Sequence, residues 1–166
     1  MTHRTRRGLR ALAAAAALTL ASTAHARAQQ AQAPLYDPRA DARAEIRAAL
    51  AAAAQDHKLV LLDFGADWCL DCVILERHFH DAAVQSYLRE HFHVVKVEVG
   101  QFDHNLEIVR KYGSPIEGGV PAVVVLAPNG SILASTRDGS MEGAGRMTPA
   151  MVRRRLEQWV AAAPRS

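Results

Sequence analysis

A short apolar run followed by two closely spaced cysteines is the feature that most limits how this chain can fold. The run KLVLLDF (58–64) has no helical period and ends at Gly65, which is typical of a buried strand. A helical pattern starts at Cys69, and Cys72 follows three residues later. The sequence therefore predicts a strand that leads into a helix whose first turn carries the only 2 cysteines of the chain.

Helical and strand patterns alternate along the rest of the chain. Helices are predicted from an Asp37 cap with Pro38 to about residue 54, from Cys69, after an Asp81 cap, over 105–113, and from a Thr148 cap with Pro149 to about residue 162. Further strands are predicted over 92–100 and on both sides of the turn Pro128-Asn129-Gly130, because Asn-Gly favours a hairpin.

This order of elements predicts an α/β fold. Alternation of helices and strands favours a parallel pair, and the hairpin adds antiparallel strands, so we expect a central mixed β-sheet flanked by helices on both faces. Residues 37–163 have the ordinary size of a single domain with one core.

Residues 1–28 have the pattern of a secretory signal peptide. A basic stretch without acids precedes the apolar run 11–21, which is short for a bilayer span, and small residues at 24–28 offer A-x-A cleavage sites after Ala26 or Ala28. We therefore expect an exported, periplasmic protein in which residues 29–36 form a flexible lead-in. The alternative is an Ala-rich amphipathic helix or an uncleaved anchor.

The charge balance excludes one class of partner. Residues 1–28 hold five of the 20 Lys and Arg residues and none of the 17 acids, so 15 basic and 17 acidic groups remain in the rest of the chain. No cluster of basic residues with interleaved aromatics is left there. We therefore expect no nucleic-acid binding.

Three explanations compete for the cysteine pair. A purely structural disulfide is a weak explanation, because closing so short a loop adds little to the stability of the folded chain. A zinc site needs two more ligands, and His78 lies six residues after Cys72, on a different side of a helix. No metal site is predicted, although soft-metal (copper) handling by Cys69 and Cys72 stays an alternative.

A catalytic dithiol is the third explanation. At the junction of strand and helix, unpaired backbone N–H groups and the helix dipole would point at the sulfur of Cys69 and favour its thiolate. Cys72 lies close enough to attack a mixed disulfide formed on Cys69, so the spacing provides an attacking and a resolving thiol. We expect the sulfur of Cys69 to be accessible.

The motifs LLDFGADWCLDC and, about 50 residues later, GGVPAVVVL resemble the thioredoxin family. The likeness extends over about 41–162. The forms ADWC and HFHDAAVQSYL are more similar to the periplasmic thioredoxin-like domains of transmembrane disulfide reductases. The resemblance implies a thioredoxin-like fold, with disulfide exchange as its chemistry.

The family pattern assigns expected roles to residues of this chain. It implies that Cys69 is the nucleophile and Cys72 the resolving cysteine. Trp68 would flank the site and bind substrate, the alternative being a core aromatic. Pro121 would be the cis proline beside the dithiol, and Val120 would offer its backbone to a substrate strand.

Asp63 matches the buried acid beneath the resolving cysteine, so the resemblance implies a general base that takes the proton of Cys72 through water. The alternative is a partly solvated aspartate at the end of a strand. Gly65 departs from the family, since thioredoxins often carry tryptophan there, and we expect a more open wall. Leu70 and Asp71 replace the frequent Gly-Pro, and the charge of Asp71 would disfavour the thiolate and make the couple more reducing.

The sequence therefore predicts an exported thiol:disulfide oxidoreductase that works as a reductase or an electron relay. It would need no cofactor besides the redox-active disulfide Cys69–Cys72. The expected partners are protein disulfide substrates and a membrane thiol electron donor, and the expected state is a monomer. A substrate-binding module with little turnover is a further alternative.

Overall fold

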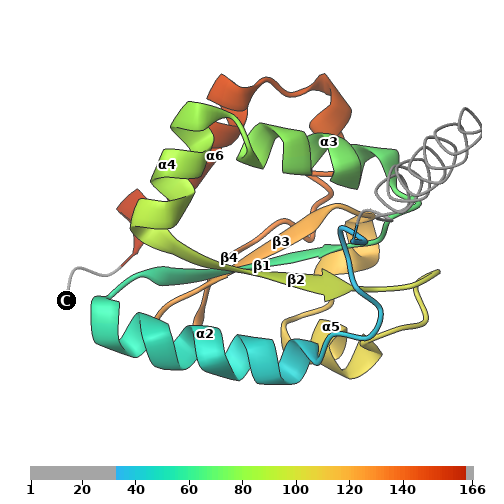
Figure 1. Cartoon of the computed structure of the whole chain (residues 1–166), viewed down its shortest axis with the longest axis horizontal. Coiled ribbons are helices and arrows are strands. Elements are labelled where there is room, and N and C mark those ends of the chain that lie inside the picture. Colours follow the sequence, from blue (N-terminus) through green and yellow to red (C-terminus); the bar gives the residue numbers. More distant parts are fainter. Residues whose placement is uncertain (1–32, 164–166) are drawn as a thin grey trace, which may run out of the picture. The chain divides into compact units, whose positions relative to one another are not determined.

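A four-stranded mixed sheet is the centre of the computed structural model, which describes residues 33–163 (Figure 1). Its strands, in the spatial order β2-β1-β3-β4, are β1 (Leu59–Gly65), β2 (Phe92–Glu98), β3 (Ala122–Leu126) and β4 (Ile132–Ser135). β1 and β2 are parallel, whereas β3 is antiparallel to both β1 and β4. The predicted parallel pair and hairpin are confirmed.

Helices cover both faces of this sheet. They are α2 (Ala42–Asp56), α3 (Leu70–Phe79), α4 (Ala82–His91), α5 (Leu106–Lys111) and α6 (Pro149–Ala162), with short 3₁₀ turns η1 (Pro115–Gly118) and η2 (Ala144–Arg146). α2 and α5 lie on one face, and α3, α4 and α6 lie on the other (Figure 1). Each face buries its own cluster of apolar side chains. The predicted α/β architecture, a central mixed sheet with helices on both faces, is confirmed.

Most helix ends follow the predicted signals. The carboxylate of Asp81 accepts the N–H of Ala83 before α4, and the hydroxyl of Thr148 accepts the N–H of Met151 before α6. Gly113 has φ +79° just after α5, which is the left-handed conformation expected of a glycine at the end of a helix.

The predicted start of the first helix is wrong by several residues. Asp41 caps α2 by accepting the N–H of Ala44, so the helix begins at Ala42. Asp37 instead closes a turn: its carboxylate accepts the N–H and the guanidinium of Arg39. Asp37 and Pro38 therefore belong to a turn, and Asp41 is the residue that caps the helix.

The packed part of the chain includes the last residue of the expected lead-in. Tyr36 is only 1% exposed, and its N–H donates to the carboxylate of Asp67 at 2.9 Å. The expected signal segment, 1–28, and residues 29–32 lie outside the described residues. Over residues 33–163, no helix has the length and apolarity needed to cross a membrane.

Strand pairing brings two loops together beside the first cysteine. β1 ends at Gly65 and continues through a turn, closed by the N–H of Cys69 on the carbonyl of Ala66, directly into α3. Because Phe64 pairs with Ala122, the loop before β3 lies next to that turn. The carboxyl end of β1 is therefore where the predicted functional residues converge.

Candidate active site

Cys69 and Cys72 are joined by a disulfide at the amino end of α3. Cys69 is the residue that caps the helix, and its Sγ accepts the N–H of Cys72 at 3.1 Å. The predicted placement of the sulfur against a free helical N–H is confirmed. Cys69 is 5% exposed and Cys72 0%, so only Cys69 reaches the surface, and it does so less than we expected.

The loop before β3 forms the second side of the site. The peptide bond between Val120 and Pro121 is cis, as the resemblance implied. The carbonyl oxygen of Val120 lies 3.5 Å from the Sγ of Cys69. A backbone acceptor therefore lies beside the sulfur of Cys69.

An apolar rim borders the disulfide. Trp68 is 49% exposed, which excludes the core-aromatic alternative, and its indole N–H donates to the carbonyl of Gly100 at 2.7 Å. Its ring lies 5.8 Å from that of Phe102, which sequence reasoning missed because Phe102 lies in a loop with φ +64° and no recognisable pattern. Leu70, which follows Cys69 in the sequence, is exposed as well.

Asp71, between the two cysteines, is tied to a distant loop. Its Oδ1 accepts the N–H of Gly145 at 2.9 Å, and a Cβ at position 145 would lie 2.5 Å from the same oxygen. The Gly-rich loop 138–145, which had no predicted role, therefore contacts the dithiol helix. The redox-tuning roles of Leu70 and Asp71 stay predictions.

Asp63 lies within a buried polar cluster. It is 0% exposed, which excludes the partly solvated alternative. Its Oδ2 accepts hydrogen bonds from the Nζ of Lys96 at 2.7 Å and from the hydroxyl of Tyr36 at 3.0 Å, and Lys96 also pairs with Glu76. Its Oδ1 is buried and has no hydrogen-bond partner among the described residues.

The charges within this cluster determine two protonation states. Burial alone would lower the pKa of Lys96, but Asp63 and Glu76 outweigh it, so the pKa is raised and Lys96 is a cation at neutral pH. Burial, followed by the charge and hydrogen bond of Asp63, raises the pKa of Tyr36 far above its usual value. Tyr36 is therefore a neutral phenol that donates its proton to Asp63.

Tyr36 also overturns the expectation of an open wall at Gly65. A Cβ built on Gly65 would lie 2.5 Å from the Cζ of Tyr36, so the tyrosine ring fills the space beside this glycine. The expectation failed because it considered only the residue at position 65. The side chain that closes the wall comes from the segment before α2.

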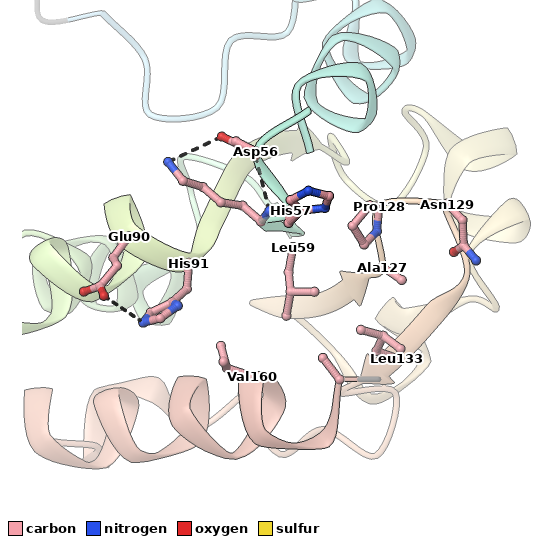
Figure 2. A pocket seen from close by; sticks show the side chains of 12 residues that line it. Asp56, His57, Leu59, Glu90, His91, Ala127, Pro128, Asn129, Leu133 and Val160 are labelled. Carbon is pink, nitrogen blue, oxygen red and sulfur yellow. Dashed lines mark hydrogen bonds and ion pairs between the residues drawn. The ribbon is translucent and has the colours of Figure 1, made fainter. Parts of the chain in front are cut away.

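A hollow lies at the end of β1 that is opposite the disulfide (Figure 2). It has a volume of about 580 Å³, and Leu59, Leu133 and Val160 line it. Its charged side chains pair with one another, Asp56 with Lys58 and Glu90 with His91.

Among residues 33–163, no three His, Cys, Asp or Glu side chains are grouped to hold a metal ion.

Known proteins are similar to this chain in sequence and in fold. Residues 41–128 match the family described as "Thioredoxin-like". The crystal structure of a disulphide isomerase from Xylella fastidiosa Temecula1 is 38% identical, covers 78% of this chain and 99% of its own, and superposes with a TM-score of 0.76.

A shorter match links the chain to a much larger protein. The thiol:disulfide interchange protein DsbD of Vibrio vulnificus is 50% identical over 42 residues, which is 25% of this chain but only 7% of that protein. The family match and the long structural likeness, together with the bonded cysteine pair, establish the class. This chain belongs to the thioredoxin-like family and is a thiol–disulfide oxidoreductase.

Proposed function

We propose that this protein is an exported disulfide reductase or electron relay that passes electrons to protein disulfides through Cys69 and Cys72. The observation that carries the proposal is the position of the Cys69–Cys72 disulfide, at the amino end of α3 and beside cis Pro121. Asp63, buried at the end of the neighbouring strand, provides a base for the second step.

The first step is attack on the client. In the reduced protein, Cys69 is the thiol that reaches the surface, and the N–H of Cys72 together with the helix dipole stabilises its thiolate. The thiolate attacks one sulfur of the client disulfide. A mixed disulfide forms on Cys69, and the other client sulfur leaves as a thiolate that takes a proton from solvent.

The second step releases the client. Cys72 gives its proton to Asp63, and the resulting thiolate attacks the Sγ of Cys69. The Cys69–Cys72 disulfide forms, the bond to the client breaks, and the second client sulfur leaves with its electron pair. That sulfur takes a proton from solvent, to which Asp63 returns the proton of Cys72. The client has gained two electrons and two protons, and the protein is oxidised.

Client recognition follows from the groups around the sulfur. The backbone of Val120 can pair with an extended client segment, as in strand addition. Trp68 and Leu70 are large apolar side chains that are exposed next to Cys69, and they would contact residues beside the client cysteine. An unfolded or flexible segment that carries a disulfide fits such a surface.

The direction that we propose for electron flow is from this protein to the client disulfide. The names of the relatives, a disulphide isomerase and a thiol:disulfide interchange protein, agree with a role in disulfide handling. In an oxidising compartment such a reductase needs a membrane thiol donor to re-reduce it. Redox titration against glutathione tests the direction, and a potential near that of strong oxidants would exclude the reductase role.

A trapping experiment tests the proposal itself. With Cys72→Ser in the exported full chain, clients cannot be released, so mixed disulfides should accumulate on Cys69 and dissolve when a reductant is added. Cys69→Ser is the matched control and should trap nothing. If Cys72→Ser yields no more adducts than this control, the protein does not exchange disulfides with proteins.

A further inference from the structure

The segment that precedes α2 reaches the buried acid of the site. Tyr36 is fixed at two points: its N–H donates to Asp67 at 2.9 Å, and its hydroxyl donates to the Oδ2 of Asp63 at 3.0 Å. Both partners lie between the end of β1 and Cys69. A residue outside the strand-and-helix motif therefore contacts the group that the proposed chemistry uses.

Gly65 shows that this place is built for the tyrosine. Gly65 does not have a positive φ, so its backbone does not require glycine. Any Cβ there would lie 2.5 Å from the Cζ and 2.6 Å from the hydroxyl oxygen of Tyr36. In a strand, residues 63 and 65 project from the same face, so the missing side chain of Gly65 is what lets the phenol reach Asp63.

The two carboxylate oxygens of Asp63 differ in their hydrogen bonds. Oδ2 receives both donors, Tyr36 and Lys96, while Oδ1 is buried without a partner. The other charged groups near this cluster are Glu76 on α3, paired with Lys96, and Asp67 in the turn, bonded to the backbone of Tyr36. A buried polar atom without a partner is costly, which favours a function for Oδ1.

We infer that Tyr36 is a positioning residue for disulfide exchange: its hydroxyl holds Oδ2 of Asp63, so that Oδ1 is the oxygen that takes the proton of Cys72. The inference rests on the proposed function, and it concerns only the second step. The proton moves from the Sγ of Cys72 to Oδ1, the Cys72 thiolate forms the bond to Cys69, and the client thiolate leaves. Tyr36 keeps its own proton throughout.

The simplest competing explanation is that Tyr36 only fills space. Tyr36→Phe separates the two roles, because it keeps the ring against Gly65 and removes only the hydroxyl. Tyr112→Phe is a matched control, since Tyr112 is another buried tyrosine, at the end of α5. Neither Cys69 nor Cys72 is altered, so the dithiol itself stays intact.

The measurement is the two-phase reaction of the reduced full chain with Ellman's disulfide reagent. The first thiolate is released when Cys69 attacks, and the second is released when Cys72 resolves the mixed disulfide. We expect Tyr36→Phe to slow the second phase about tenfold at neutral pH, which is the worth of one hydrogen bond to a charged group, and to leave the first phase unchanged. Tyr112→Phe should alter neither.

The difference between the two phases is a readout that a merely structural role would not give. A general loss of packing would slow both phases, because α3 carries Cys72 and is capped by Cys69, whereas loss of the hydroxyl alone slows only the second phase. An unchanged second phase in Tyr36→Phe, or an equal loss in both phases, would overturn the inference.

If Tyr36→Phe fails to fold, a measurement on the unmodified protein tests the inference instead. With ¹³Cζ-labelled tyrosine, the chain gives signals from 3 tyrosines. The Tyr36 signal should keep the chemical shift of a neutral phenol up to about pH 11, because burial and Asp63 raise the pKa of Tyr36; a change to the phenolate shift below that pH would contradict the inference. Because the reagent is not a protein, these results stand apart from the client trap, whose failure would refute only the proposed function.

Discussion

Two ionic clusters lie near opposite ends of the parallel strands β1 and β2, and they differ in burial. At the end next to the dithiol, Asp63 pairs across β1 and β2 with Lys96 and is 0% exposed. At the other end, Asp56 pairs with His93 and Lys58, and its side chain is 38% exposed. The two clusters use the same kinds of groups in different surroundings.

The difference in burial bears on the role of each cluster. Burying charges costs solvation that the ion pair only partly restores, so a buried pair is weak grounds for stability and is often replaceable by apolar residues. An exposed pair costs little and contributes little. Stability alone therefore does not explain Asp63, Lys96 and Glu76, whereas the role that we propose for Asp63, as the proton acceptor of Cys72, does.

Removing the cation of the buried cluster should have the largest effect on folding. Lys96→Met leaves the carboxylates of Asp63 and Glu76 without their shared partner, and we expect the free energy of unfolding to fall by about 3 kcal/mol. Urea denaturation at pH 7 measures it. Lys58→Met, at the exposed cluster, should leave the free energy of unfolding unchanged. Equal losses in the two variants would contradict the difference between the clusters.

Filling the space at Gly65 should have the next largest effect. Gly65→Ala forces the ring of Tyr36 away from Asp63, and we expect a loss of about 2 kcal/mol in unfolding free energy. If the cost comes from Tyr36, the same substitution in a Tyr36→Leu background should cost far less. A cost that persists in that background would locate the strain elsewhere.

The loss of unfolding free energy at alkaline pH should depend on Tyr36. Its pKa is raised above the ordinary value of about 10, so its contribution is complete below pH ~10 and is lost as pH rises, because the unfolded chain then releases a proton that the native state keeps. Each such proton steepens the decline by about 1.4 kcal/mol per pH unit. Chemical denaturation from pH 9 to 11 should show a shallower decline for Tyr36→Phe, and identical slopes would argue against the buried phenol.

The exposed cluster should respond least, and at the opposite end of the pH scale. Burial would raise the pKa of Asp56, but the hydrogen bonds and charges of His93 and Lys58 outweigh it, so the pKa is lowered. Its contribution is present above pH ~4 and is lost as pH falls through the lowered value. Asp56→Asn should therefore flatten the acid limb slightly, in thermal unfolding from pH 5 to 2; a change as large as that of Lys96→Met would contradict the comparison.

The sequence predicted the elements that local patterns determine. The strand before Cys69, the cap at Asp81 and the Asn-Gly hairpin follow from residue type and spacing, and they are where we expected them. The cis bond at Pro121 came from the family resemblance, since no local rule gives a proline isomer.

The partners of Asp63 could not be predicted in the same way, because they come from three separate segments. Tyr36 precedes the first helix, Glu76 lies on α3 and Lys96 on β2, and only strand register and helix packing bring them together. One signal was present: a lysine within the valine-rich run VVKVEV indicates a buried partner of opposite charge. The hydroxyl of Tyr36 had no such signal, since its partner depends on a missing side chain at Gly65.

The central claim is that the buried cluster accepts the proton of the resolving cysteine, and the rate of the second phase in Asp63→Asn tests it most directly. We expect this rate to fall about a hundredfold at pH 7 while the first phase stays unchanged, which is the low end of what a positioned base contributes. Asp56→Asn, the equivalent change at the exposed end, should match the unmodified protein. A second phase within twofold of normal in Asp63→Asn, with the protein folded, would contradict the account.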